Sequence, residues 1–135
     1  MARCEVKPRR ISPEDQALLE RAFQLAKKSR STKTGVASVL KATDGRVFQG
    51  VNIEVKGSAP CSMCAEYAAI GAMVTEGATR IATIVAVSGK KHAILPPCGK
   101  CRQLISEFGN PYVIVKLRGR VVKTRLKDIY PMQIG

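Results

Sequence analysis

The 135-residue sequence predicts an α/β fold in which helices cover the faces of a mixed β-sheet. Segments with apolar residues at helical spacing alternate with short apolar runs and hairpin signals, in the order α-β-β-α-β-α-β-β. That order favours one sheet with helices packed against it. The length and a hydrophobic fraction of 45% fit a single domain, residues 1–135, with one substantial core.

The first expected helix begins within residues 12–15, which read Ser-Pro-Glu-Asp. Ser is a favoured N-cap, Pro fits the first helical position, and two acids suit the positive end of the helix dipole. Apolar residues then repeat at helical spacing to about Lys28. A hairpin follows, with strands Val36–Leu40 and Arg46–Ile53 joined through the turn signal Asp44-Gly45.

The second half of the chain continues this alternation. A loop, Glu54–Met63, leads into an Ala- and Met-rich helix, Cys64–Thr75, which Gly77 ends. The apolar run Ile81–Val87 suits a buried strand and is followed by a loop. The remaining expected elements are a helix at Cys98–Phe108, strands at Tyr112–Leu117 and Val121–Thr124, and a last helical turn at Leu126–Ile129.

The charge balance is strongly basic, with 23 Lys and Arg against 10 Asp and Glu and a formal net charge of +13. The basic residues are spread along the chain, and only 4% of residues are aromatic, so a base-stacking platform is not evident. We therefore expect a solvated basic surface and no nucleic-acid partner. No apolar stretch is long enough to span a membrane, and Met1–Arg10 lacks the apolar core of a secretory signal.

These features predict a cytoplasmic protein with no membrane partner. Thiols stay reduced in that compartment, so the five cysteines are expected to be metal ligands or buried thiols rather than disulfides.

Four cysteines form two Cys-x-x-Cys pairs, Cys61 with Cys64 and Cys98 with Cys101. Four such thiolates usually close a structural zinc site, which in a basic chain would suit a nucleic-acid-binding module. The alternative is an open zinc site in which Cys64, Cys98 and Cys101 leave a fourth position for water. Glu66 would then move protons for that water.

Three features favour the open, catalytic site. The stretch Ala65–Pro97 is longer than a compact zinc ribbon needs and contains a helix and a buried strand. Cys64 and Cys98 begin predicted helices, whose N–H groups and dipoles stabilise thiolates. Cys98 and Cys101 lie three residues apart, on one helix face. The remaining thiols, which carry no assigned role, are Cys4 and Cys61.

Four motifs carry a family resemblance: Asp44-Gly45-Arg46, Gly50–Glu54, Cys64-Ala65-Glu66 and Pro97–Gln103. With them the chain resembles the cytidine deaminase family, in particular its small members with three Cys ligands. The resemblance implies a three-layer α/β/α sandwich with a five-stranded mixed sheet. It also implies a homotetramer with active sites at subunit interfaces.

The resemblance further implies an enzyme of pyrimidine salvage that binds Zn²⁺ through Cys64, Cys98 and Cys101. Such an enzyme hydrolyses cytidine or deoxycytidine to uridine or deoxyuridine plus ammonia, and Glu66 carries the protons. In this family Asn52 and Glu54 match residues that hydrogen-bond the ribose hydroxyls.

Ala65 is expected beside Asn52 and Glu54 in the substrate site. Many family members have, directly after Cys-Ala-Glu, an arginine that hydrogen-bonds a ligand sulfur. Tyr67 takes that position here, and Arg102 is the expected substitute.

Other segments resemble the blasticidin-S deaminase branch, and two substrate-covering aromatics usual in cytidine deaminases are missing. Residues 32–34 read Thr-Lys-Thr where a Phe is usual, and Tyr130 is the only aromatic candidate in the tail. Glu54, however, is the cytidine deaminase form. A modified cytosine nucleoside such as blasticidin S is therefore the alternative substrate. His92, the only histidine, is interpreted as a solvated loop residue.

Overall fold

The computed structural model describes residues 7–28, 35–57 and 62–129. Helices are α1 (Pro13–Ala26), α2 (Ala65–Thr75), α3 (Gly99–Ser106) and α4 (Leu126–Ile129). Strands are β1 (Arg9–Arg10), β2 (Val36–Ala42), β3 (Val47–Val51), β4 (Ile81–Ser88), β5 (Ala93–Ile94), β6 (Tyr112–Leu117) and β7 (Arg120–Arg125). None of the helices in these ranges is long and apolar enough to cross a membrane.

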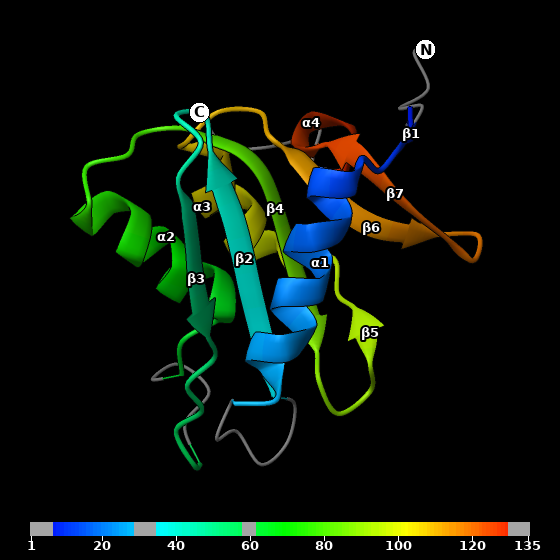
Figure 1. Ribbon diagram of the computed structural model, residues 1–135. Helices are drawn as coiled ribbons and strands as arrows, with labels where there is room; N and C mark the ends of the chain where they lie inside the picture. The colour runs from blue at the N-terminus through cyan, green and yellow to red at the C-terminus, as the bar shows by residue number, and fades with distance from the viewer. Residues whose placement is uncertain (1–6, 29–34, 58–61, 130–135) are drawn as a thin grey trace.

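The strands form one mixed sheet in the order β1-β7-β6-β4-β2-β3, with β5 paired to β4 (Figure 1). Only β4 and β6 run parallel among the described pairs. The predicted five strands are all present, but the expected count of five is wrong because the sheet has seven. The two additions, β1 and β5, are two residues long, too short to show a period-2 pattern in the sequence.

Helices cover both faces of the sheet, which confirms the three-layer α/β/α prediction. Helix α1 packs on one face with a core of buried residues that includes Val39, Val85 and Ile114. Helices α2 and α3 cover the other face, where the alternate positions Leu40 and Ile84 are buried. Because successive side chains of a strand point to opposite faces, the same strands serve both cores.

Helix α1 begins as predicted, with a capping box. The Asp15 N–H donates to Ser12 Oγ at 3.1 Å, and the Ser12 N–H donates to Asp15 Oδ2 at 2.8 Å. The helix ends at Ala26, slightly before the expected Lys28. Lys123 of β7 also donates from Nζ to Asp15 Oδ2 at 2.8 Å, so this largely buried carboxylate joins the helix to the sheet.

We expect Asp15→Asn to cost about 2–3 kcal/mol of stability near neutral pH, since it removes half of a buried ion pair. Burial opposes ionisation of Asp15, but hydrogen bonds from Lys123 and Ser12 outweigh it and lower its pKa. A lowered folded-state pKa gives stability that is present above the unfolded pKa and lost as pH falls through the folded one. The difference between variant and wild type in urea unfolding should therefore shrink as pH falls below about 4, the ordinary pKa of an unfolded Asp.

Glu14→Gln is the matched control, because Glu14 pairs with Lys41 at the exposed surface. Its cost should be clearly smaller than that of Asp15→Asn, because solvent screens an exposed ion pair. Equal costs for the two variants, or a cost of Asp15→Asn that does not change with pH, would contradict the assigned role of Asp15.

The close approach of α2 to β3 depends on Gly50. A Cβ atom at this position would lie 2.5 Å from both Ala68 Cβ and the Ala69 nitrogen. Real carbon contacts of this kind are longer, and the Ala69 nitrogen belongs to helix backbone that cannot rotate away. Gly50 therefore sets the distance at which α2, and with it Cys64 and Glu66, sits on the sheet.

Gly50→Ala is expected to destabilise the protein by about 2–4 kcal/mol through overpacking. Gly71→Ala on helix α2 is the control, since its added Cβ would meet nothing within 4 Å. That change should be neutral or stabilise by up to about 1 kcal/mol, because Ala favours helix. Thermal and urea unfolding of both variants measures the contrast; similar effects of the two changes would refute the packing argument.

Candidate active site

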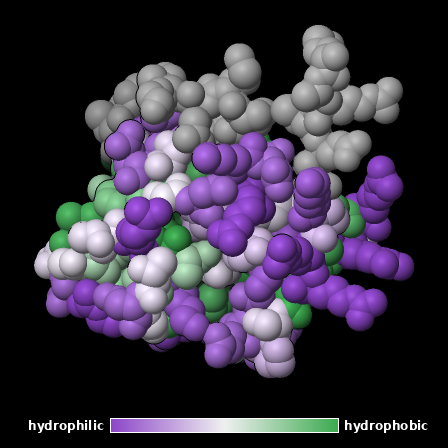
Figure 2. Space-filling view, turned by 90° about the horizontal axis from the view of Figure 1, so that it is seen from above, coloured by the Kyte–Doolittle hydropathy of each residue, from purple (hydrophilic) through white to green (hydrophobic). Residues whose placement is uncertain are grey.

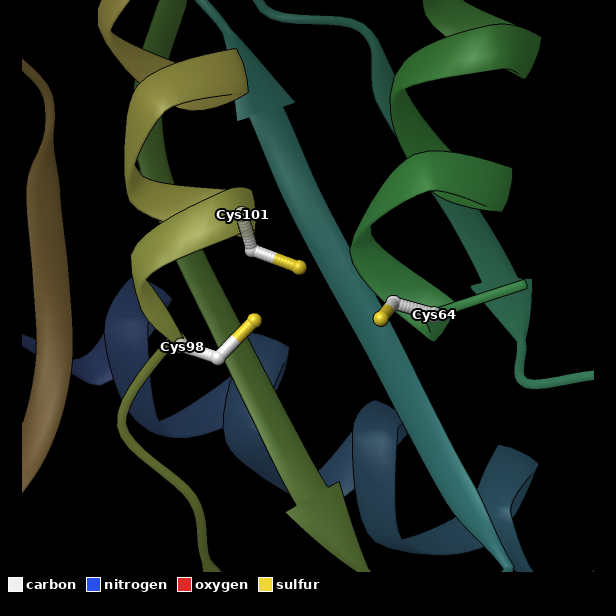
Figure 3. Close-up of side chains that lie close together, drawn as sticks. All are labelled: Cys64, Cys98 and Cys101. Carbon is white, nitrogen blue, oxygen red and sulfur yellow. The ribbon is translucent and has the colours of Figure 1, made fainter. Parts of the chain in front are cut away.

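Three cysteine side chains converge between the starts of α2 and α3 (Figure 3). The sulfurs of Cys64, Cys98 and Cys101 all lie within 4.8 Å of one another. Cys64 comes from the start of α2, and the other two come from the start of α3. They are the only group of three or more potential metal ligands of this kind in the described part of the chain.

The two helix starts place these sulfurs. Cys64 is the N-cap of α2 with φ −70° and ψ 149°, and Cys98 is the N-cap of α3 with φ −70° and ψ 171°. Neither side chain caps its own helix, so both thiols point toward the shared centre. Cys101, 1% exposed, follows one turn into α3 on the same face. The prediction that Cys64 and Cys98 start helices is confirmed.

The donor set fits a zinc ion. Thiolates are favoured zinc ligands, and tetrahedral Zn–S bonds of about 2.3 Å separate neighbouring sulfurs by about 3.8 Å, which is compatible with the observed cluster. Burial raises the pKa of Cys64 and Cys101. Burial also opposes ionisation of Cys98, but hydrogen bonds from Cys101 and Lys100 lower its pKa. A bound cation would stabilise all three thiolates together.

Glu66 lies in the first turn of α2 and is 7% exposed. Burial raises its pKa, an effect that hydrogen bonds from the backbone and Cys101 only partly offset. A carboxyl group with a raised pKa holds and releases protons nearer to neutral pH, as a general acid and base must.

A pocket of about 390 Å³ opens at the cysteine cluster. Seven of the eight predicted site residues line it: Asn52, Glu54, Cys64, Ala65, Glu66, Cys98 and Cys101. The structure thus brings together residues from the end of β3, the start of α2 and the start of α3. Several apolar lining residues were not foreseen, among them Val36, Ile53, Met63, Ala86 and Leu95.

A backbone N–H holds Asn52 at the pocket wall, and the Asn52 side chain in turn holds Glu54. Asn52 Oδ1 accepts from the Val36 N–H at 3.0 Å, and Asn52 Nδ2 donates to Glu54 Oε1 at 3.1 Å. Two backbone hydrogen bonds of 2.9 and 2.7 Å between Ile53 and Met63 tie this wall to the segment before α2. The amide therefore fixes the Glu54 carboxylate in the pocket.

Arg102 does not lie in the pocket, and the expectation that it hydrogen-bonds a ligand sulfur is wrong. Its Nε donates to the Pro97 carbonyl and its Nη1 to the Ile129 carbonyl, both at 2.7 Å, rather than to a ligand sulfur. Successive helix residues are turned by about 100°, so the residue after Cys101 projects in another direction. Arg102 ties the segment before Cys98 to α4.

Lys100 was not foreseen. It lines the pocket, and its Nζ lies 4.8 Å from the centre of the Tyr67 ring. This contact joins α2 to α3 across the site with a positive charge, and no local sequence pattern signals it.

His92 is exposed, as predicted, but its ring stacks on Phe23 with centroids 4.2 Å apart. Several residues considered in the sequence lie outside the described residues: Cys4, residues 32–34, Cys61 and Tyr130.

Comparison with known proteins agrees with this geometry. Residues 12–117 match the family model described as "Cytidine and deoxycytidylate deaminase zinc-binding region". The matched range contains both helix starts, Glu66 and all three converging cysteines.

Among curated proteins, a blasticidin-S deaminase of Bacillus cereus is 30% identical over 132 residues, covering 91% of this chain and 94% of its own. A cytidine deaminase of Sporosarcina psychrophila is 30% identical over 84% of this chain and 88% of its own. A crystal structure of cytidine deaminase from Mycobacterium tuberculosis superposes with a TM-score of 0.77 and 28% identity, over 92% of this chain and 99% of that one. By matched domain, overall similarity and fold, the chain belongs to the zinc-binding cytidine and deoxycytidylate deaminase family.

Proposed function

We propose that this enzyme deaminates cytidine and deoxycytidine, with Cys64, Cys98 and Cys101 as its zinc ligands and Glu66 as its proton carrier. The observation that carries the proposal is the single pocket in which the three sulfurs, Glu66 and the Asn52–Glu54 pair meet. The fold and family match of the chain support it.

When bound, the zinc ion supplies a Lewis acid that lowers the pKa of water to about 7. Glu66 accepts a proton from the attacking water and passes protons to the ring nitrogen and to the leaving amine. Water adds at C4 of the pyrimidine, the C4–N4 bond breaks, and ammonia leaves. The buried position of Glu66 keeps bulk water from competing for these protons.

Asn52, Glu54 and Ala65 form the substrate-binding part of the proposal. The Glu54 carboxylate, oriented by Asn52, accepts hydrogen bonds from ribose hydroxyls, and the Ala65 backbone borders the base. A pocket of this size admits a nucleoside.

Glu54→Gln is expected to raise KM for cytidine by about 10- to 100-fold with a smaller effect on kcat, since it weakens a charged hydrogen bond to the sugar. The control is a second substrate, 2′,3′-dideoxycytidine, which lacks the 2′ and 3′ hydroxyls. With this substrate, wild type and variant should have the same KM. A penalty that persists with the dideoxy substrate would contradict the sugar-binding role.

A substrate panel tests the proposed function itself. Loss of nucleoside absorbance should follow addition of zinc-loaded enzyme to cytidine or deoxycytidine. The second candidate is blasticidin S, which the similarity to the Bacillus cereus enzyme over 91% of this chain favours. Turnover of blasticidin S without turnover of either nucleoside would replace the proposed substrate and leave the chemistry unchanged.

We also propose a cytoplasmic homotetramer with active sites at subunit interfaces. Support comes from exposed apolar side chains beside the pocket, namely Ile53 (56% exposed), Met63 (44%) and Val55 (41%). Such a rim suits burial against a second subunit. Light scattering coupled to gel filtration measures the mass; a monomer with full activity would overturn this part.

A further inference from the structure

Pairing of β1 with β7 gathers arginines from the two ends of the chain. Arg9 lies opposite Lys123, and Arg10 lies opposite Val122. Two more arginines lie nearby: Arg118 in the turn after β6 and Arg120 at the start of β7. Together they surround a hollow of about 750 Å³, here called the arginine hollow, lined by Pro8, Arg9, Arg10, Leu117, Arg118, Arg120 and Val122.

Among the residues that the structure describes, no carboxylate forms an ion pair with an arginine of this hollow. The ion pairs within residues 7–28, 35–57 and 62–129 are Lys41–Glu14, Arg46–Asp44 and Lys123–Asp15. None of them involves an arginine of the hollow, and all four arginines are exposed. Hydrophilic side chains project from the right-hand side of Figure 2, the side on which the β6–β7 turn lies in Figure 1.

Positive charge continues around the same edge of the sheet. Arg9, Lys123 and Arg125 lie 5.8, 4.8 and 3.9 Å from the centre of the Tyr112 ring. Asp15 neutralises only Lys123 there. Because Tyr112 is already surrounded by cations, the surface attracts anions without offering a ring for base stacking.

The chemistry of the surface limits the classes of partner that it can bind. Two copies of the chain would not pair through this surface, because that would place like-charged arginines opposite one another. A membrane surface would require exposed apolar anchors beside the charges. The exposed large apolar residues of the described chain are instead Ile53, Val55, Met63 and Val74, around β3 and α2. Guanidinium groups match the geometry of phosphate oxygens.

We propose that the arginine hollow and the adjoining cations bind the phosphate backbone of a single-stranded nucleic acid, without sequence preference. The hollow admits one flexible strand, whose successive phosphates meet Arg10, Arg118 and Arg120, while Leu117 and Val122 contact its apolar parts. This second function is independent of the proposed deaminase reaction, since none of these residues lines the active-site pocket. It also departs from the expectation of a scattered, solvated surface, because strand pairing concentrates charges that are distant in sequence.

The test compares two charge-matched triple variants by fluorescence anisotropy with a labelled oligouridylate of about 20 nucleotides. One variant combines Arg10→Gln, Arg118→Asn and Arg120→Gln; Asn suits the positive φ of 51° at position 118. The control combines Lys28→Gln, Lys90→Gln and Lys91→Gln, exposed positions outside the hollow. Both variants lose three positive charges, and unchanged melting and cytidine turnover would verify that they fold.

We expect the hollow variant to bind at least about 10-fold more weakly than wild type at roughly 100 mM salt, and the control to stay within about 3-fold. The negative slope of log affinity against log salt should become less steep by about 2 for the hollow variant, since three phosphate contacts are lost. Absence of wild-type binding at about 50 mM salt, or equal losses in both variants, would overturn the proposal. So would displacement of the oligonucleotide by polyglutamate at equal charge concentration, which would assign the surface to an acidic protein.

Discussion

Glu66→Gln is expected to lower kcat about 1,000-fold or more while zinc content and folding stay unchanged. General acid and base catalysis contributes about 100- to 10,000-fold, and every proton transfer in the proposed reaction passes through this carboxylate. Gln has the same shape, so it fills the 7% exposed position without a cavity, but it neither accepts nor releases a proton at neutral pH. Steady-state turnover of cytidine, with zinc measured by mass spectrometry, gives the result.

Glu76→Gln is the control for this variant. Glu76 is the exposed C-cap of the same helix and does not line the pocket, so its neutralisation should leave kcat within about 2-fold. A Glu66→Gln enzyme with a normal rate would refute the mechanism. A Glu66→Gln protein that loses zinc would show instead that the carboxylate is needed for the metal.

Cys101→Ser is expected to remove zinc, abolish turnover and destabilise the fold. Cys101 is buried, and a hydroxyl is a poor replacement for a thiolate in a zinc site. Loss of the metal also removes the binding free energy that is coupled to folding. We expect zinc to fall from about one per chain to a small fraction, with a melting temperature lower by at least about 10 °C.

Cys61→Ser separates the two zinc sites that the sequence allows. With three ligands, Cys64, Cys98 and Cys101, this variant should keep both zinc and activity. With a closed site of four cysteines it would lose zinc as Cys101→Ser does. Zinc retention by Cys101→Ser, or its loss by Cys61→Ser, would therefore overturn the three-cysteine assignment.

Features of the fold and of the site that depend on neighbouring residues were predictable, because their signals are local in the sequence. Ser12 with Asp15 fixes a helix start through adjacent backbone groups, and the structure shows the capping box. Cys98 and Cys101 share a helix face because of the helical repeat alone. Family motifs added Asn52 and Glu54, and both line the pocket.

The predictions that failed depend on the direction of a side chain or on contacts between segments distant in sequence. Arg102 was expected at a sulfur, but its rotation on α3 sends it to the carbonyls of Pro97 and Ile129. The contact of Lys100 with Tyr67 joins two helices whose relative position no local pattern gives. Strand β1 pairs with the outer side of β7, and β5 pairs with the end of β4 that extends beyond its pairing with β6, so both depend on the position of distant strands.

By itself the sequence determined the fold class, the helix starts that carry Cys64 and Cys98, and the residues capable of zinc chemistry. Spacing and capping encode these features within a few residues. Only the tertiary structure decided that Gly50 sets the distance between α2 and the sheet and that Asn52 orients Glu54. It also decided that arginines from distant parts of the chain share one hollow. The physical reason is that strand pairing and helix packing join residues remote in sequence, and such contacts leave no periodic pattern along the chain.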